Sequence, residues 1–306
     1  MTGALAARIS AQLQQEVRPE VARFAAQLAE DSGAMAALFY GSNLRTGSLD
    51  GVLDFYLLLP GRQVDRIWPR VSYHEREDGD VVLRAKVATM SLEQFGKACR
   101  GKSRDTTIWA RFVQPSALAW LAGEPLIDPV VDAISSAVQT AAKLAVALGP
   151  ECGAEREYWR ALFAATYEAE FRVEKAGRED SILDIHAAHF DGLLPLALEP
   201  QGIAFVIDEG RIEPRMDVAQ RRAILLWWRK RRRLGKPLNL LRLVKAATTF
   251  EGAAHYAAWK VERHTGVPIE VTPFREKHPL LAAPGALIEV MRARRYSRAG
   301  TSDNQK

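Results

Sequence analysis

The sequence predicts an α+β protein with a strand-rich N-terminal part and a mainly helical C-terminal part. Before residue 105, short apolar runs end at glycine, proline or aspartate-glycine turns, which is typical of buried strands. After residue 105, apolar residues recur every three or four positions, which is the period of helices with one buried face. This separation of strands from helices indicates two domains, with a boundary near residue 125.

The N-terminal part begins with one or two helices over residues 3–30, which are interrupted near Pro19. Ser91 and Gln94 form a capping-box pattern that predicts a further helix at 92–98. The expected strands cover residues 35–40, 52–59, 71–75 and 81–90. The last two form a hairpin or lie as neighbours.

Helical periodicity accounts for most of the chain after residue 105. The expected helices cover 105–122, 130–148, 154–176, 180–197, 217–234, 238–250, 251–264 and 280–292. A small hairpin at 202–213 interrupts them, and the polar tail from residue 296 is expected to be disordered. The predicted organisation is a first domain at 1–125, a helical domain at 126–275, and a C-terminal helix with a basic tail at 276–306.

The composition describes an ordinary globular chain with a basic surface. Of 306 residues, 48% are hydrophobic and 26% are charged, and the net charge of +5 favours anionic partners such as nucleotides, nucleic acid or acidic lipid. Cys99 and Cys152 lack metal-ligand spacing and indicate a reducing compartment. We find no signal peptide and no window near the ~20 apolar residues that span a bilayer, so any membrane contact is expected to be peripheral.

The most informative segment joins two expected strands at residues 39–59. The first strand ends in Gly41-Ser42, and Asp54 lies within the next strand. A glycine lets the backbone approach a phosphate, and the amides and hydroxyl after it can cradle a triphosphate, aided by a helix N-terminus. A carboxylate on the adjacent strand can hold Mg²⁺. Gly-Ser alone is usually only a turn, but this order of elements resembles the DNA-polymerase-β-like nucleotidyltransferases.

The acidic strand departs from the usual pattern of that superfamily, which carries a second acid two residues after the first, on the same face. That position is Tyr56 here. Asp50 is the other nearby carboxylate, but it precedes Gly51 and is equally well interpreted as a turn residue. We therefore take Asp54 as the main metal ligand and Asp50 as a weaker one.

Two basic residues are candidates for binding phosphate beside Asp54. Lys86 shares one face of the expected strand 81–90 with Arg84, although an exposed edge lysine is the simpler interpretation of Lys86 alone. Arg111 lies in an apolar helical run, where it is either a phosphate ligand or part of a buried ion pair.

Together these pieces resemble the mitochondrial-type CDP-diacylglycerol synthases, the translocator-assembly-and-maintenance family of phosphatidate cytidylyltransferases. In order, that family has a Tyr-Gly-Ser strand end, an acidic strand, a Lys-containing strand before a Ser-Leu helix start, and a helix with Arg four residues before Pro. The matching residues are Tyr40, Gly41, Ser42, Asp54, Lys86, Ser91, Leu92, Arg111 and Pro115. The resemblance covers residues 38–116 and is weaker in the helical half.

This resemblance implies a polymerase-β-like nucleotidyltransferase domain with a mixed sheet, followed by a mainly helical, winged-helix-like domain. It implies an enzyme that transfers CMP from CTP to phosphatidate with Mg²⁺, giving CDP-diacylglycerol and pyrophosphate in phospholipid biosynthesis. The implied catalytic residues are Asp54, Lys86 and Arg111, with the metal on Asp54 and Asp50 and the nucleotide on Tyr40, Gly41, Ser42 and Asn43. Without a transit-type N-terminus, the chain resembles a bacterial member, expected in the cytoplasm at the inner face of the plasma membrane.

A basic, tryptophan-containing stretch at 217–250 is predicted to dock this lipid substrate. Tryptophan favours the headgroup level of a bilayer, and each basic residue near an anionic surface contributes about 1 kcal/mol. The expected docking side chains are Trp227, Trp228, Arg229, Arg231, Arg232 and Arg233. The alternatives are a core-packed helix with a solvated basic face and a nucleic-acid patch.

Other functions share parts of this pattern. A nucleotidyltransferase with a soluble acceptor, such as an antibiotic or a sugar phosphate, would keep residues 41–54 without needing the basic helix. A catalytically inactive module that binds membrane or nucleic acid is consistent with Tyr56 at the second-acid position. His186 and His189 have a spacing found in metal sites, but no further ligand is near them in sequence, so we expect ordinary packing.

Overall fold

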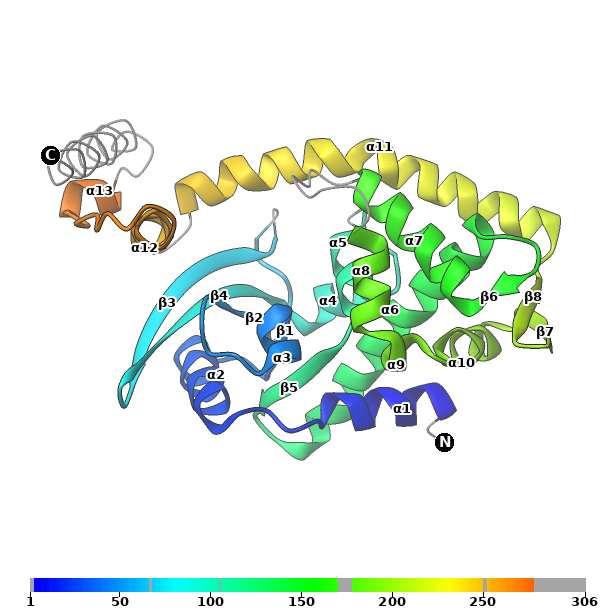
Figure 1. Cartoon of the computed structure of the whole chain (residues 1–306), viewed down its shortest axis with the longest axis horizontal. Coiled ribbons are helices and arrows are strands. Elements are labelled where there is room, and N and C mark those ends of the chain that lie inside the picture. Colours follow the sequence, from blue (N-terminus) through cyan, green and yellow to red (C-terminus); the bar gives the residue numbers. More distant parts are fainter. Residues whose placement is uncertain (1–2, 66–67, 105, 170–177, 250–251, 278–306) are drawn as a thin grey trace, which may run out of the picture.

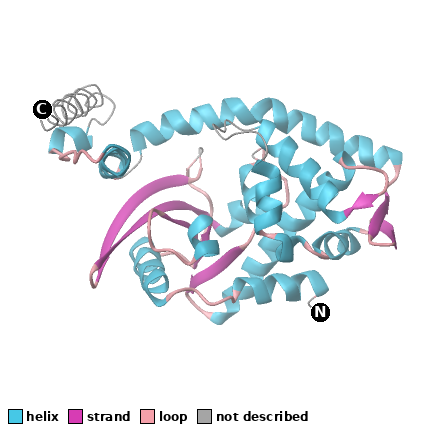
Figure 2. Cartoon of the chain, viewed as in Figure 1, coloured by secondary structure: helices cyan, strands magenta, loops and turns pink. Residues whose placement is uncertain are grey.

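The computed structural model describes residues 3–65, 68–104, 106–169, 178–249 and 252–277. Within them, the chain is a mixed α/β protein in which a sheet lies beside a larger group of helices (Figure 1). The strands gather mainly in one part of the molecule, and helices make up most of the rest (Figure 2). The expected helix at 280–292 and the tail from 296 lie outside the described residues.

A mixed five-stranded sheet forms the N-terminal part, in the order β3-β4-β2-β1-β5. Its strands are β1 (Ala36–Tyr40), β2 (Leu53–Leu59), β3 (Arg70–Asp78), β4 (Val81–Ser91) and β5 (Ser116–Leu121). β2 and β4 run parallel, and the other neighbouring pairs are antiparallel. The strands expected from the apolar runs are confirmed, and β3 and β4 form a hairpin.

The prediction of one helix over 105–122 is wrong. Only α5 (Thr107–Phe112) is helical there, and β5 follows it. Pro115 disfavours helical geometry at the residue before it, so the helix ends and the chain turns. β5 then pairs with the edge of β1. A short apolar run fits a helix or a strand equally well by period, and the exposed edge of β1 decides the outcome.

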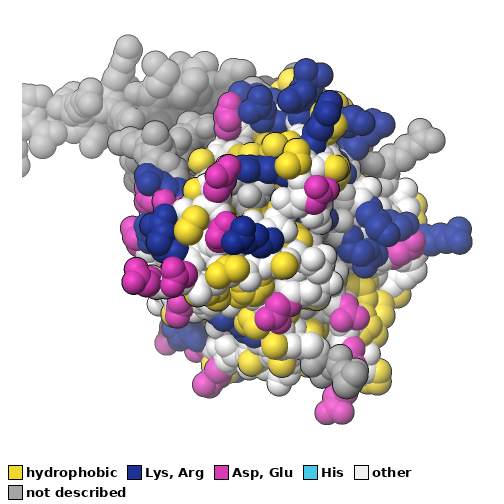
Figure 3. Space-filling view, turned by 90° about the vertical axis from the view of Figure 1, so that its right-hand side faces the viewer, with side chains coloured by type: hydrophobic (Ala, Val, Ile, Leu, Met, Phe, Trp, Pro, Cys, Tyr) yellow, Lys and Arg dark blue, Asp and Glu magenta, His cyan; other side chains and the backbone are white. Residues whose placement is uncertain are grey.

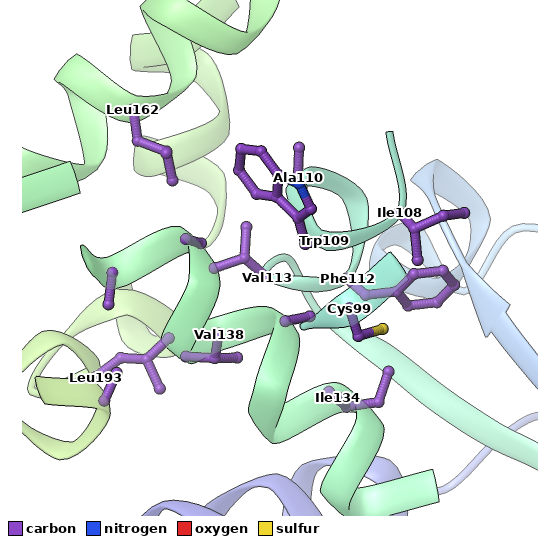
Figure 4. Close-up of a cluster of buried hydrophobic side chains, with 14 of the residues drawn as sticks. Cys99, Ile108, Trp109, Ala110, Phe112, Val113, Ile134, Val138, Leu162 and Leu193 are labelled. Carbon is purple, nitrogen blue, oxygen red and sulfur yellow. The ribbon is translucent and has the colours of Figure 1, made fainter. Parts of the chain in front are cut away.

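Helices cover both faces of the sheet. α2 (Pro19–Ser32) packs Val21 and Phe24 against the face that carries Phe55. The other face lies on α1 (Ala4–Leu13), α4 (Leu92–Cys99), α5 and α6 (Ile127–Leu148), in a core that includes Trp109 and Leu162 (Figure 4). The predicted break at Pro19 and the helix after Ser91 are thus confirmed, and Ser91 Oγ accepts a hydrogen bond from the Gln94 amide at 3.2 Å.

α6 corrects one expectation about the membrane. Together with the short 3₁₀ turn Glu124–Leu126 before it, this helix is long and apolar enough to cross a membrane. Of its most apolar stretch, however, 78% is buried inside the protein. α1, α4, α5 and α7 (Glu155–Ala169) pack around it. Its apolar side chains therefore form the protein core.

The helices that follow break more often than their period predicts. The segment expected as one helix at 180–197 is divided into α8 (Arg178–Ile185), α9 (Ala187–Phe190) and α10 (Leu193–Leu198). Gly192 has a φ of 67°, a left-handed conformation that separates α9 from α10. Glu155 caps α10, because its carboxylate accepts hydrogen bonds from the amides of Gly192 and Leu194 at 2.7 and 2.6 Å.

A small three-stranded sheet joins β6 (Gly153–Ala154), which precedes α7, to a hairpin that follows α10 and a 3₁₀ turn at Glu199–Gln201. Its order is β6-β8-β7, with β7 (Ala204–Asp208) and β8 (Arg211–Arg215) in the hairpin. β7 and β8 confirm the hairpin expected at 202–213.

α11 (Val218–Thr249) is one helix where two were expected, at 217–234 and 238–250. Pro237 lies inside it on an exposed position, so its ring faces solvent and the helix continues with the loss of one backbone hydrogen bond. Gly235 faces inward, where a Cβ would collide with the Ala169 carbonyl. α11 runs along the top of the molecule from the helices to the sheet (Figure 1). α12 (Ala253–Thr265) and α13 (Pro273–Lys277) follow it.

His189 ties α9 to α5 and explains why its spacing from His186 is not a metal signal. Its Nε2 lies 2.8 Å from the Val113 carbonyl and donates a hydrogen bond to it. Burial lowers the pKa of His189 to about 4, and the bond to Val113 opposes this shift only partly. His189 is therefore a neutral, packed side chain at physiological pH.

We predict that acid destabilises the fold through His189. Because its folded pKa is depressed, its contribution is complete above pH ~6.5 and is lost as the pH falls toward 4, by at most roughly 3 kcal/mol. In His189→Gln, whose amide still donates to Val113, urea unfolding measured between pH 6.5 and 4 should depend less on pH. The exposed control His255→Gln should behave like the wild type. An unchanged slope in His189→Gln would contradict this assignment.

Candidate active site

The candidate active site lies where one row of side chains crosses the sheet. The backbone register places Tyr40 of β1 opposite Asp54 of β2, and Asp54 beside Lys86 of β4. Lys86 in turn lies opposite Tyr73 of β3. Paired residues on neighbouring strands share a face, so a carboxylate and an ammonium group stand between two phenols. The pairing of β2 with β4 therefore brings together two residues that sequence reasoning selected separately.

Gly41 ends β1 directly against the Asp54 carboxylate. Its φ is 89°, and a Cβ at this position would lie 3.0 Å from Asp54 Oδ2. Only glycine meets both requirements without strain. Gly41 and Ser42 are exposed, so the backbone that follows β1 is open to a ligand beside the carboxylate.

Asn43 holds the loop between β1 and β2 in place. Its buried amide Nδ2 donates to the carbonyls of Ser48 and Asp50 at 3.0 and 2.8 Å, and its Oδ1 accepts from Ser42 Oγ at 3.2 Å. Its side chain thus supports the short helix α3 (Ser42–Thr46) and the loop after it. Asp50 is exposed in this loop.

Arg111 reaches the row from the last turn of α5. Its guanidinium carbon lies 5.3 Å from the centre of the Tyr40 ring, in a cation–π contact. Its charge also acts on Asp54 and Lys86. The predicted catalytic residues Asp54, Lys86 and Arg111 are therefore neighbours in the folded chain, although α5 and β2 are far apart in sequence.

Desolvation and charge oppose each other in this row. Burial raises the pKa of Asp54, while Lys86 and Arg111 lower it. The Lys86 side chain is exposed, but the protein around it displaces enough water that desolvation lowers its pKa. The charge of Asp54 opposes this shift, and the charges of Arg111 and Lys260 add to it. Burial raises the pKa of Tyr40 to about 12. The row thus holds one carboxylate among several cations, an arrangement that suits a polyanion with a metal ion.

Tyr56 belongs to the core beneath the row. It is fully buried, and its ring centre lies 5.4 to 6.3 Å from those of Phe112, Phe95 and Tyr40. The position that carries a second acid in the polymerase-β-like pattern therefore contributes an aromatic floor here. Asp50, the other carboxylate that the sequence predicted as a metal ligand, lies exposed in the loop before β2.

The helix expected at 251–264 is confirmed as α12, but its position beside the row was not predicted. The rings of Tyr73 and Tyr256 are 5.3 Å apart, and the Arg84 guanidinium lies 5.5 Å from the Trp259 ring centre. Aromatic and basic residues repeat at one-turn spacing along α12, and this pattern is the only sequence signal for the contact.

The expectation that Trp227 and Trp228 face a membrane is wrong. Trp228 is 4% exposed and packs on Trp109, and Trp227 Nε1 donates to the Gly101 carbonyl at 3.2 Å. Arg231 also points inward, and its guanidinium donates to the carbonyls of Gly101 and Ser103 at 2.6 and 3.1 Å. These three residues attach α11 to α5 and to the loop before it.

Other basic residues of α11 face solvent, although Arg221 and Arg242 bind backbone carbonyls of neighbouring elements. The exposed ones include Arg222, Arg229, Lys230, Arg232, Arg233 and Lys236. Leu226, Leu240 and Leu241 are 43%, 55% and 47% exposed on the same helix. Lys and Arg side chains gather along the top of the face seen in Figure 3. Of the residues expected to dock on a membrane, Arg229, Arg232 and Arg233 are therefore exposed, whereas the two tryptophans and Arg231 face the protein interior.

No family model matches this chain, and no curated protein matches it at a significant level. Its chemistry therefore has to be argued from the row itself. Cavities of about 470 and 380 Å³ lie elsewhere, beside α4 and beside α7, and no residue of the row lines either. Among the described residues, no three His, Cys, Asp or Glu side chains are grouped to hold a metal. The row offers a single carboxylate, surrounded by cations.

We predict that Lys86→Met raises the pKa of Asp54 further, because it removes the positive charge that most favours the carboxylate. The pKa of Asp54 is measured by carbon NMR titration of its carboxyl group. Lys97→Met, on an exposed lysine bound to Glu93, serves as the control and should leave this pKa unchanged. An unchanged pKa in Lys86→Met would show that the two charges do not interact.

Proposed function

We propose that this protein is a nucleotidyltransferase that moves CMP from CTP onto phosphatidate, giving CDP-diacylglycerol and pyrophosphate. One observation carries the proposal: the glycine that ends β1 lies against the Asp54 carboxylate, with Lys86 and Arg111 beside it. An open backbone, one carboxylate and two cations are the groups that a metal-bound triphosphate needs. The mixed sheet supports a polymerase-β-like domain, and the winged-helix-like character of residues 126–275 stays a prediction.

Magnesium fits this set of residues. In nucleotide sites Mg²⁺ is bound through one or two carboxylates, with phosphate and water oxygens as its other ligands. Asp54 would supply one carboxylate, and the exposed Asp50 is the candidate for a second. When bound, the ion would neutralise charge on the phosphates as pyrophosphate leaves.

The protein's own groups act mainly by position and charge. The backbone after Gly41 would hold the triphosphate beside Asp54. Lys86 and Arg111 would balance negative charge on the triphosphate and on the phosphate of phosphatidate. A phosphatidate oxygen forms a bond to the α-phosphorus of CTP as the bond to the β-phosphate oxygen breaks. No side chain has to remove a proton, because the attacking phosphate is already ionised. Catalysis then depends on alignment and electrostatic stabilisation.

The exposed side of α11 supports a lipid acceptor. Basic residues there alternate with Leu226, Leu240 and Leu241, which lie at the surface. Such a combination favours an anionic bilayer, since basic groups bind headgroups and leucines enter the interface. The proposed location is therefore the inner face of the plasma membrane.

One observation favours a second candidate, a binding module without transferase activity. Tyr56 is buried at the position where polymerase-β-like enzymes carry their second acid. A row with one carboxylate can bind a nucleotide without catalysing transfer.

We predict that Asp54→Asn lowers turnover by about 10²-fold or more, because it removes the carboxylate proposed to hold the metal. Turnover is measured as Mg²⁺-dependent release of pyrophosphate from CTP, with and without phosphatidate. The fold should remain, since Asn has nearly the size and shape of Asp and burial disfavours the charged form of Asp54. Asp50→Asn should have the smaller effect. Full activity in Asp54→Asn would refute the site. CTP binding by the wild type without release of pyrophosphate would favour the binding module.

We predict that replacing Arg229, Lys230, Arg232 and Arg233 by Gln weakens binding to vesicles of phosphatidylglycerol by tenfold or more. Each basic residue at such a surface contributes about 1 kcal/mol, and all four side chains are exposed. Co-sedimentation measures the binding. Arg231→Gln is the matched control, because its loss of inward hydrogen bonds should lower the melting temperature while vesicle binding is kept. If the quadruple variant binds vesicles as well as the wild type does, α11 is a core-packed helix with a solvated basic face and not a membrane-binding one.

A further inference from the structure

α12 is fixed on β3 by a close backbone contact. Gly252, which precedes the helix, has a φ of 76°, and a Cβ there would lie 2.6 Å from the Tyr73 carbonyl oxygen. A larger residue at this position would force α12 away from β3. The ring contact between Tyr73 and Tyr256 adds to the attachment. The start of α12 is therefore held at the end of the row.

The next turns of α12 reach β4 and the loop before β2. Arg84 of β4 is bound to Glu75 at 3.3 Å and stands over Trp259 of α12. Arg263 lies 5.2 Å from the same ring centre, and its Nη1 would be 3.2 Å from a Cβ on Gly51. α12 thus crosses β3, β4 and the start of β2 in order, and forms a wall beside the row.

Lys260 follows Tyr256 by one turn of α12, and the Tyr256 ring packs on Tyr73, which is paired with Lys86 across β3 and β4. The Lys260 ammonium nitrogen lies 5.6 Å from the Tyr256 ring centre, its side chain is exposed, and its charge acts on Lys86. No salt bridge between described residues includes Lys86 or Lys260. Asp54 balances part of the charge of Lys86, and a further anion that contacts both lysines would relieve the repulsion between them. Phosphate is an anion that lysine pairs bind well.

We propose that Lys260 and Lys86 form a phosphate-binding site in which α12 supplies a contact to the phosphomonoester of the acceptor. The identity of the acceptor rests on the proposed function, whereas anion binding does not. Lys86 lies on the β4 side of Asp54 and Gly41 on the β1 side. The two phosphate groups of the reaction would therefore meet at Asp54 from opposite sides, and the triphosphate would not compete with the acceptor for Lys260.

Calorimetric titration of the full chain with inorganic phosphate tests the anion site without turnover. Lys260→Met should weaken phosphate binding about tenfold, and Lys260→Arg should restore most of it. Gly252→Ala keeps every cation but displaces α12, so it should weaken binding as well. Lys97→Met is the control of equal charge change and should bind like the wild type. Equal phosphate binding by the wild type and Lys260→Met would overturn the proposal.

Turnover with CTP and a short-chain, water-soluble phosphatidate identifies which phosphate occupies the site. In Lys260→Met, the KM for phosphatidate should rise about tenfold, while the KM for CTP stays within about twofold. A rise in the KM for CTP instead would assign Lys260 to the triphosphate and overturn the acceptor assignment. Phosphate binding that depends on Lys260, in a chain that releases no pyrophosphate, would refute the transferase function and still support the anion site.

Discussion

The parallel pairing of β2 with β4 fixes the candidate site. Side chains of a strand alternate between faces, so a slip of one residue would move Asp54 to the α2 side of the sheet. Two separate cores prevent this slip, because Phe55 and Leu57 pack on one face while Tyr56 and Leu58 pack on the other. The same apolar packing that builds the fold therefore holds Asp54 beside Lys86.

The aromatic floor under the row shapes its electrostatics. Tyr56, Phe95 and Phe112 are fully buried below Tyr40 and Asp54, so water is excluded from that side. Charges above an apolar floor are weakly screened, so burial raises the pKa of Asp54 while the neighbouring cations lower it. The buried Tyr56 below Asp54 thus strengthens the electrostatic interactions of this carboxylate.

α11 shows how one basic run serves two purposes. Trp227 and Arg231 face inward and bind the loop before α5, and Trp228 packs on α5, the helix that carries Arg111. Arg229, Lys230 and Arg233 point away from the protein. An arginine that faces inward satisfies backbone carbonyls, whereas one on the outer side is available to an anionic partner.

The sequence by itself determined the strands β1 to β4, the break at Pro19, and the choice of Gly41, Asp54, Lys86 and Arg111, because turn residues, apolar runs and charged residues inside apolar segments are local signals. Tertiary structure decided β5, the continuity of α11 through Pro237, the inward side of Trp228, and the contact of α12 with the row. Each of these depends on a partner distant in the chain: the edge of β1, the solvent side of a packed helix, the tryptophan in α5, or the carbonyl of Tyr73. A local sequence pattern indicates which residues have the right chemistry. Only tertiary packing decides whether their side chains face the interior or solvent and which residues they contact.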